Sequence, residues 1–155
     1  MFSLLILSCN EKKNEKTIED QSIKWEEIEI NTLTEKINIS KFSDSAEYIQ
    51  DLNKVAFKIL NEDGTITKEE IIRKKIVFTK SEKDSLVKYI YNAVTNPKFS
   101  NVLATDYAGT VQLTFDTGTT KLICEYHSVG DWSIVSDNTR KIYELLSKKV
   151  KISKS

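Results

Sequence analysis

The sequence predicts one α+β domain in which an antiparallel sheet of about five to seven strands is covered on one face by two helices. Two observations support this class. Residues 81–95 and 138–150 place their apolar side chains at helical spacing, whereas the segments before each of them alternate apolar and polar residues. Strands followed by a packing helix therefore occur twice along the chain, which is typical of this architecture.

Two short strands are predicted near the start of the domain, as a hairpin or separately, because four isoleucines alternate with polar residues: Ile28, Ile30, Ile37 and Ile39. Residues 42–53 are ambiguous, since several of their apolar residues have helical spacing. Alternation predicts further strands over 55–59, 65–70 and 75–79, and Asp63-Gly64 supplies a hairpin turn between the first two of these.

Each predicted helix has its own start signal. Ser81 is the expected N-cap of the first helix, and Asn96-Pro97 ends it, because the residue before a proline avoids helical geometry. Asp137 or Thr139 can cap the second helix. The apolar stripe of this second helix is expected to consist of Ile142, Leu145, Leu146 and Val150.

The clearest hairpin is predicted in the second half of the domain. Apolar residues alternate over 111–115 and again over 122–126, on either side of the turn sequence Asp116-Thr-Gly-Thr119. A further turn at Gly130-Asp131 leads to a third strand, which we expect to begin at Trp132.

The composition bounds the classes of function. Lys plus Arg and Asp plus Glu each number 23, so the formal net charge is zero and nothing points to a nucleic acid as partner. Hydrophobic residues make up 39% of the chain and charged residues 30%, which is ordinary for a folded domain. Cys124 lies in the apolar register of a predicted strand, so we expect a buried and inert thiol there.

The chain begins with a short apolar run that ends at Cys9. The run is too short to span a bilayer and stops abruptly at charged residues. Ile6-Leu7-Ser8-Cys9 resembles the lipobox of bacterial lipoproteins, in which the signal peptide is cut before the cysteine and the cysteine is acylated. The resemblance implies lipidation of Cys9 and a membrane-anchored position in the bacterial cell envelope, facing the periplasm or the cell exterior.

The resemblance divides the chain into three parts. Residues 1–8 would be the signal peptide, complete or truncated at its start, and residues 9–22 the lipidated cysteine with a flexible, charged tether. Residues 23–152 would form the globular domain. The abundance of Lys, Asn and Ile also resembles small envelope lipoproteins of Bacteroidota. The alternative for the first residues is a buried N-terminal strand.

One segment resembles the calcium loop of EF-hand proteins, with Gly64 as the sharp-turn glycine and Glu70 as the bidentate ligand. Asn61 and Asp63 would occupy two further ligand positions. Ile59 stands where that family has its first aspartate, which removes a primary oxygen ligand. A hairpin turn explains the segment better, so we expect neither a metal nor another cofactor.

His127 is the single histidine, so any histidine-based catalysis depends on it. If the apolar residues of the 122–126 strand face the core, Glu125 and His127 share the opposite face. Such a pair is usually a solvated surface contact. The chain also has no Gly-x-Ser-x-Gly elbow and no glycine-rich phosphate loop. We therefore expect no catalytic activity.

The function expected from these observations is that of a non-catalytic, lipid-anchored cell-envelope protein that binds a partner, which we expect to be another protein. Aromatic side chains at strand ends often anchor such interfaces, and Trp132 and Tyr107 are the candidates for the interaction surface. Two alternatives remain open. One is an immunity-type lipoprotein that neutralises a toxin, and the other is a small envelope enzyme that uses His127.

Overall fold

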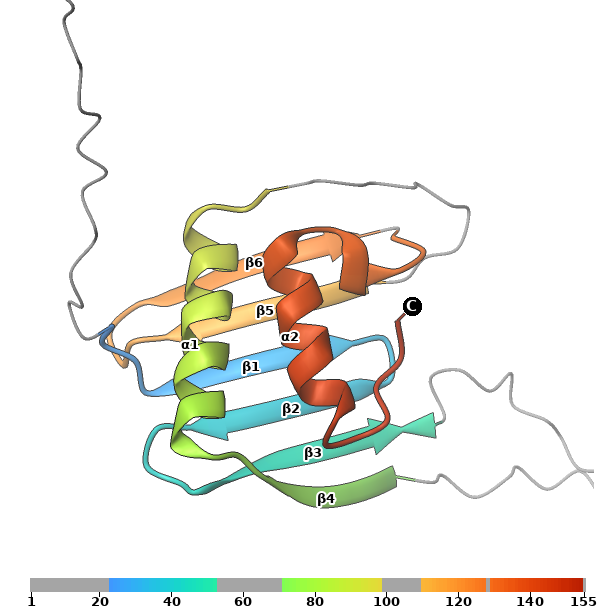
Figure 1. The fold of residues 1–155 in the computed structure, drawn as a ribbon, viewed down its shortest axis with the longest axis horizontal. Helices are drawn as coiled ribbons and strands as arrows, with labels where there is room; N and C mark the ends of the chain where they lie inside the picture. Colours follow the sequence, from blue (N-terminus) through green and yellow to red (C-terminus); the bar gives the residue numbers. More distant parts are fainter. Residues whose placement is uncertain (1–22, 53–70, 99–109, 128, 155) are drawn as a thin grey trace, which may run out of the picture.

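A computed structural model describes residues 23–52, 71–98, 110–127 and 129–154 of the chain. Within these ranges, six antiparallel strands form one sheet in the order β4-β3-β2-β1-β5-β6. The helices α1 and α2 lie side by side on one face of this sheet, as Figure 1 shows. This arrangement confirms the predicted α+β class.

The alternating isoleucines form the first hairpin, made of β1 (Glu27–Thr32) and β2 (Glu35–Ser40). The isoleucines of the two strands lie opposite one another, because both sets point to the helix-covered face. The ambiguous segment is a strand, β3 (Ser45–Asp51), with Ala46 and Tyr48 buried and polar residues between them.

The next strand, β4 (Ile71–Val77), covers the first part of the predicted strand 75–79 and begins earlier than expected. It pairs with β3 and forms one edge of the sheet. The strands predicted over 55–59 and 65–70, with their Asp-Gly turn, lie outside the described residues.

The second hairpin matches its prediction closely, with β5 (Thr110–Asp116) and β6 (Lys121–His127). Gly118 has a φ of +83°, a conformation that glycine adopts without a steric penalty. The side chain of Asp116 accepts a 2.7 Å hydrogen bond from the Gly118 amide and so fixes the turn. β5 also pairs with β1, which joins the two hairpins into one sheet.

α1 (Lys80–Thr95) starts one residue earlier than expected, and its N-cap is Thr79 rather than Ser81. The Thr79 hydroxyl accepts from the Glu82 amide, and the Glu82 carboxylate accepts from the Thr79 amide. This capping box satisfies two backbone donors at once, whereas a cap at Ser81 would leave them without that partner.

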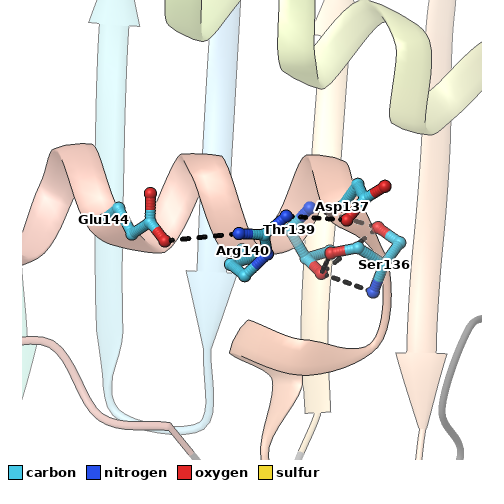
Figure 2. A network of polar contacts seen from close by, with 5 residues as sticks. All are labelled: Ser136, Asp137, Thr139, Arg140 and Glu144. Carbon is cyan, nitrogen blue, oxygen red and sulfur yellow. Dashed lines mark hydrogen bonds and ion pairs between the residues drawn. The ribbon is translucent and has the colours of Figure 1, made fainter.

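α2 (Asp137–Ser147) is capped by Ser136, so the predicted caps at Asp137 and Thr139 were wrong by one and three residues. The Ser136 and Thr139 side chains each accept from the other residue's amide, as Figure 2 shows. On the exposed side of the same helix, Arg140 bridges Asp137 at 2.8 Å and Glu144 at 3.8 Å. The helix ends at Ser147, before the predicted end at 150.

The third strand predicted to begin at Trp132 was also wrong, because residues 132–134 form a short 3-10 helix, η2 (Trp132–Ile134). The Asp131 carboxylate accepts from the Ser133 amide at 2.8 Å and favours this tight turn. The turn directs the Trp132 ring into the core, where it packs edge-on against Tyr143 at a centroid distance of 5.5 Å.

Buried side chains of the sheet and of η2 form hydrogen bonds with the last described residues. Tyr48 donates to the Lys151 carbonyl and Trp132 donates to the Ser153 carbonyl, each at 2.8 Å. Glu35 is only 4% exposed, and its carboxylate accepts from the hydroxyl groups of Thr32 and Ser153. Burial and the nearby Glu35 charge raise the pKa of Tyr48 to about 12, so its hydroxyl stays a donor.

Candidate functional site

The face of the sheet opposite the helices carries mainly polar side chains, and we call it the open face. Strand alternation and register place its side chains in rows across all six strands. One row consists of Lys75, Glu47, Asn38, Glu29, Thr114 and Ile123. The next row consists of Arg73, Ile49, Lys36, Asn31, Gln112 and Glu125.

A hydrogen-bonded network lies at the centre of the open face. The Glu29 carboxylate accepts from Lys36 Nζ and from Asn31 Nδ2, both at 2.6 Å. Asn31 also donates to Gln112 at 3.4 Å. Burial opposes ionisation of Glu29, but the hydrogen bonds from Lys36 and Asn31 outweigh it and hold the pKa of Glu29 below 4.5. The network is therefore charged at neutral pH.

Asn38 lies beside this network, and its Oδ1 atom is buried with no hydrogen-bond partner among the described residues. Thr114, on the other side of Glu29, is also buried although it belongs to the open face. A covered acceptor without a donor costs free energy. The centre of the open face thus combines fixed charges with closely packed polar side chains.

One end of the open face carries the pair expected from sequence. His127 Nε2 lies 3.4 Å from a Glu125 carboxylate oxygen, and His127 Nδ1 lies 3.3 Å from the Thr110 hydroxyl. The side chains of His127 and Glu125 are 69% and 36% exposed, so water screens their interaction. A pair placed in this way can bind a charged group, and its exposed side chains remain in contact with water.

The opposite edge of the sheet is basic. Arg73, Lys74 and Lys75 follow one another in β4, and Arg73 contacts Glu47 of β3 at 3.3 Å. An open groove of about 510 Å³ lies beside these residues. It is lined by Ser43, Ser45, Ala46, Glu47, Arg73, Lys74 and Lys75. Hydroxyl and cationic groups thus converge at this edge of the sheet.

The structure corrects one of the two predicted interaction residues. Trp132 is 0% exposed and lies among the core residues under the helices, so it cannot belong to an exposed surface. The 3-10 turn that replaced the expected strand is the reason. Tyr107, the lipidation candidate Cys9 and the calcium-like segment 59–70 lie outside the described residues. Cys124 is buried and unpaired with another cysteine, as expected.

Sequence reasoning missed the open face as a site, although part of its signal was present. The polar residues that alternate with the buried isoleucines of β1 and β2 are Glu29, Asn31, Lys36 and Asn38. Alternation assigns these four side chains to one face, but only the register between strands brings Gln112 and Glu47 next to them.

The described ranges contain no group of three or more His, Cys, Asp or Glu side chains placed to hold a metal ion. In the same part of the chain no helix is both long and apolar enough to cross a membrane. Comparison with protein-family models, curated proteins and solved structures found no match.

Proposed function

We propose that this chain is a non-catalytic, lipid-anchored protein of the bacterial cell envelope that binds a protein partner through its open face. The observation that carries the proposal is the row arrangement, which presents fixed hydrogen-bonding and charged groups from all six strands on one side. A rigid sheet holds such groups in place better than a loop does, so binding orders few additional side chains.

The mixture of charges on the open face supports a protein as partner. Lys36 and Glu29 alternate in the centre, and Arg73 with Glu47 continues the pattern toward β4. Interleaved charges of both signs complement the mixed surface of a protein, whereas nucleic-acid sites are predominantly basic.

The proposed anchor would assist binding. A lipidated Cys9 and the charged tether that follows it would confine the domain to a layer near the membrane. Confinement raises the effective concentration of the domain relative to any partner in the same layer, so a moderate affinity suffices. The exposure of His127 and Glu125 supports a binding role for this pair over a catalytic one.

The experiment is position-resolved photo-crosslinking in cells that express the chain with its full upstream coding region. A photo-crosslinking amino acid replaces Glu47 on the open face in one version and Lys88 on the exposed side of α1 in the matched control. We expect one protein to be captured in stoichiometric amounts from position 47 and not from position 88, because only the first position lies on the proposed surface.

A Cys9→Ser version and metabolic labelling with a clickable fatty acid test the anchor. We expect label on the unaltered chain, no label on the Cys9→Ser chain, and much weaker capture by the latter. Equal capture from positions 47 and 88 would contradict the assigned surface. An unlabelled chain would contradict the anchor while leaving the surface assignment standing. A captured toxin would identify an immunity protein.

A further inference from the structure

The outer edge of β6 differs from an ordinary protected sheet edge. β6 is the last strand of the sheet, and within the described ranges it pairs with β5 alone. The backbone hydrogen bond from Thr117 to Thr120 closes the hairpin, and antiparallel bonding alternates from that pair onward. The amide and carbonyl groups of Lys121, Ile123 and Glu125 therefore point away from β5, toward the outside.

The side chains along this edge are complementary to themselves. When two copies of Lys121-Leu-Ile-Cys-Glu125 are aligned antiparallel about Ile123, each Lys121 lies opposite Glu125 of the other copy. The two Ile123 side chains lie opposite each other. In this register each outward-pointing residue exchanges backbone hydrogen bonds with its opposite residue. Sequence, charge and backbone direction thus favour the same alignment.

Ile123 is the apolar residue at the centre of this alignment, and 54% of it is exposed. Its side chain lies on the open face, so it adds nothing to the core beneath the helices. On the opposite side of β6, Leu122 and Cys124 would meet across the same axis and continue the apolar layer.

The other sheet edge is protected against such pairing. β4 carries the consecutive cations Arg73, Lys74 and Lys75, so antiparallel alignments of two copies centred on these residues bring like charges together. Charged residues of this kind are a common means of blocking edge-to-edge association. β6 instead has one lysine, Lys121, and one glutamate, Glu125, each two residues from Ile123.

We propose that two copies of this chain associate by antiparallel pairing of β6 about Ile123, which joins their sheets into one. Directly opposite residues point to the same side of a sheet, so the two open faces would form one continuous surface with all helices behind it. This inference does not depend on the identity of any partner.

Disulfide crosslinking in the natural membrane setting tests the alignment. The chain carries Ile123→Cys together with Cys124→Ser, retains Cys9 and is oxidised in cells before electrophoresis without reductant. Position 123 meets itself across the axis, so we expect a homodimer band. The matched control is Glu125→Cys in the same background, which gives no such band, because the two copies of position 125 lie several residues apart along the paired strands.

Charge reversal separates pairing from a merely structural effect. In the Ile123→Cys background, Lys121→Glu or Glu125→Lys alone places like charges opposite each other, and we expect about tenfold less crosslinked dimer. The double change restores opposite charges and recovers the band. Equal crosslinking from positions 123 and 125, no recovery in the double variant, or a crosslink from position 123 to a different protein would each overturn the proposal.

Discussion

The two faces of the sheet are built from the same strands but have opposite chemistry. In β1, Ile28 and Ile30 are fully buried beneath the helices, whereas Glu29 and Asn31, which alternate with them, lie on the open face. The covered face contains the apolar core and the buried ring of Trp132. The open face contains ion pairs and hydrogen bonds that are partly exposed to water.

The covered face and the open face therefore contribute differently to the stability of the domain and to its binding. A buried apolar side chain contributes through contacts that nothing replaces when it is shortened. A partly exposed charge contributes little, since water takes the place of its partner. Substitutions on the covered face should therefore unfold the domain, while those on the open face should leave it folded and change what it binds.

The largest loss of stability is expected from Trp132→Ala. The ring is 0% exposed, packs against Tyr143, and donates to the Ser153 carbonyl. We expect the free energy of unfolding to fall by about 3–5 kcal/mol in denaturant titrations. Trp132→Phe keeps a ring in the cavity and should lose much less. A loss below about 1 kcal/mol for the alanine variant would show that this ring is not part of the core.

Glu35→Ala comes next, because Glu35 is a buried polar group at the margin of the covered face. Its removal takes away the carboxylate that accepts from the hydroxyl groups of Thr32 and Ser153 and leaves each of them only a longer contact. We expect a loss of about 2–3 kcal/mol and faster hydrogen exchange at the Ser153 amide, which donates to Glu35 at 3.2 Å. Unchanged exchange at Ser153 would mean that Glu35 does not hold the C-terminal segment.

Ser136→Ala tests the cap of α2 and should have a smaller effect. The Ser136 hydroxyl accepts from the Thr139 amide at 3.1 Å. Loss of this bond should lower the free energy of unfolding by about 1 kcal/mol. Asp137→Asn keeps the capping box intact and removes an exposed charge that contacts Arg140 in the first turn, so it serves as the control. Equal losses in the two variants would contradict the assignment of Ser136 as the cap.

The smallest loss is expected from Glu29→Gln, which removes a charge from the centre of the open face. The pKa of Glu29 is lowered in the folded state, so its contribution is present above 4.5 and disappears as the pH falls through the folded pKa. We expect the variant to lose at most about 1 kcal/mol at neutral pH and to show a shallower decrease in the free energy of unfolding as the pH falls below 4.5. Urea titrations at several pH values measure how the free energy of unfolding of the variant and of the unaltered chain depends on pH. Parallel curves for the two proteins would contradict the prediction.

The sequence was sufficient to predict the covered face but not the open one as a site. Regular alternation around Ile28 and Ile30, and the stripe of α1, reflect burial directly, so the class, the first two strands and the second hairpin could be predicted, while the pairing of the first two strands stayed open. The wrong predictions fall where local hydrogen bonds in turns and helix caps determine the structure. The caps at Thr79 and Ser136 and the 3-10 turn at Trp132 depend on side-chain hydrogen bonds that periodicity does not encode.

The open face could not be predicted as a unit, because its rows depend on strand order. Glu47 and Gln112 are far apart in sequence and enter neighbouring rows only after β3 pairs with β2 and β5 pairs with β1. The polar character of each residue was visible, but the arrangement required the register.

The most direct test of the central claim compares capture of the same partner by Lys36→Glu and Lys88→Glu chains. Lys36 lies in the central network of the open face, and Lys88 is an exposed lysine on α1. Thermal unfolding of both variants first establishes that each is folded. The account predicts that Lys36→Glu lowers capture about tenfold or more and that Lys88→Glu leaves it unchanged. Equal capture by the two folded variants would contradict the assignment of the open face as the binding surface.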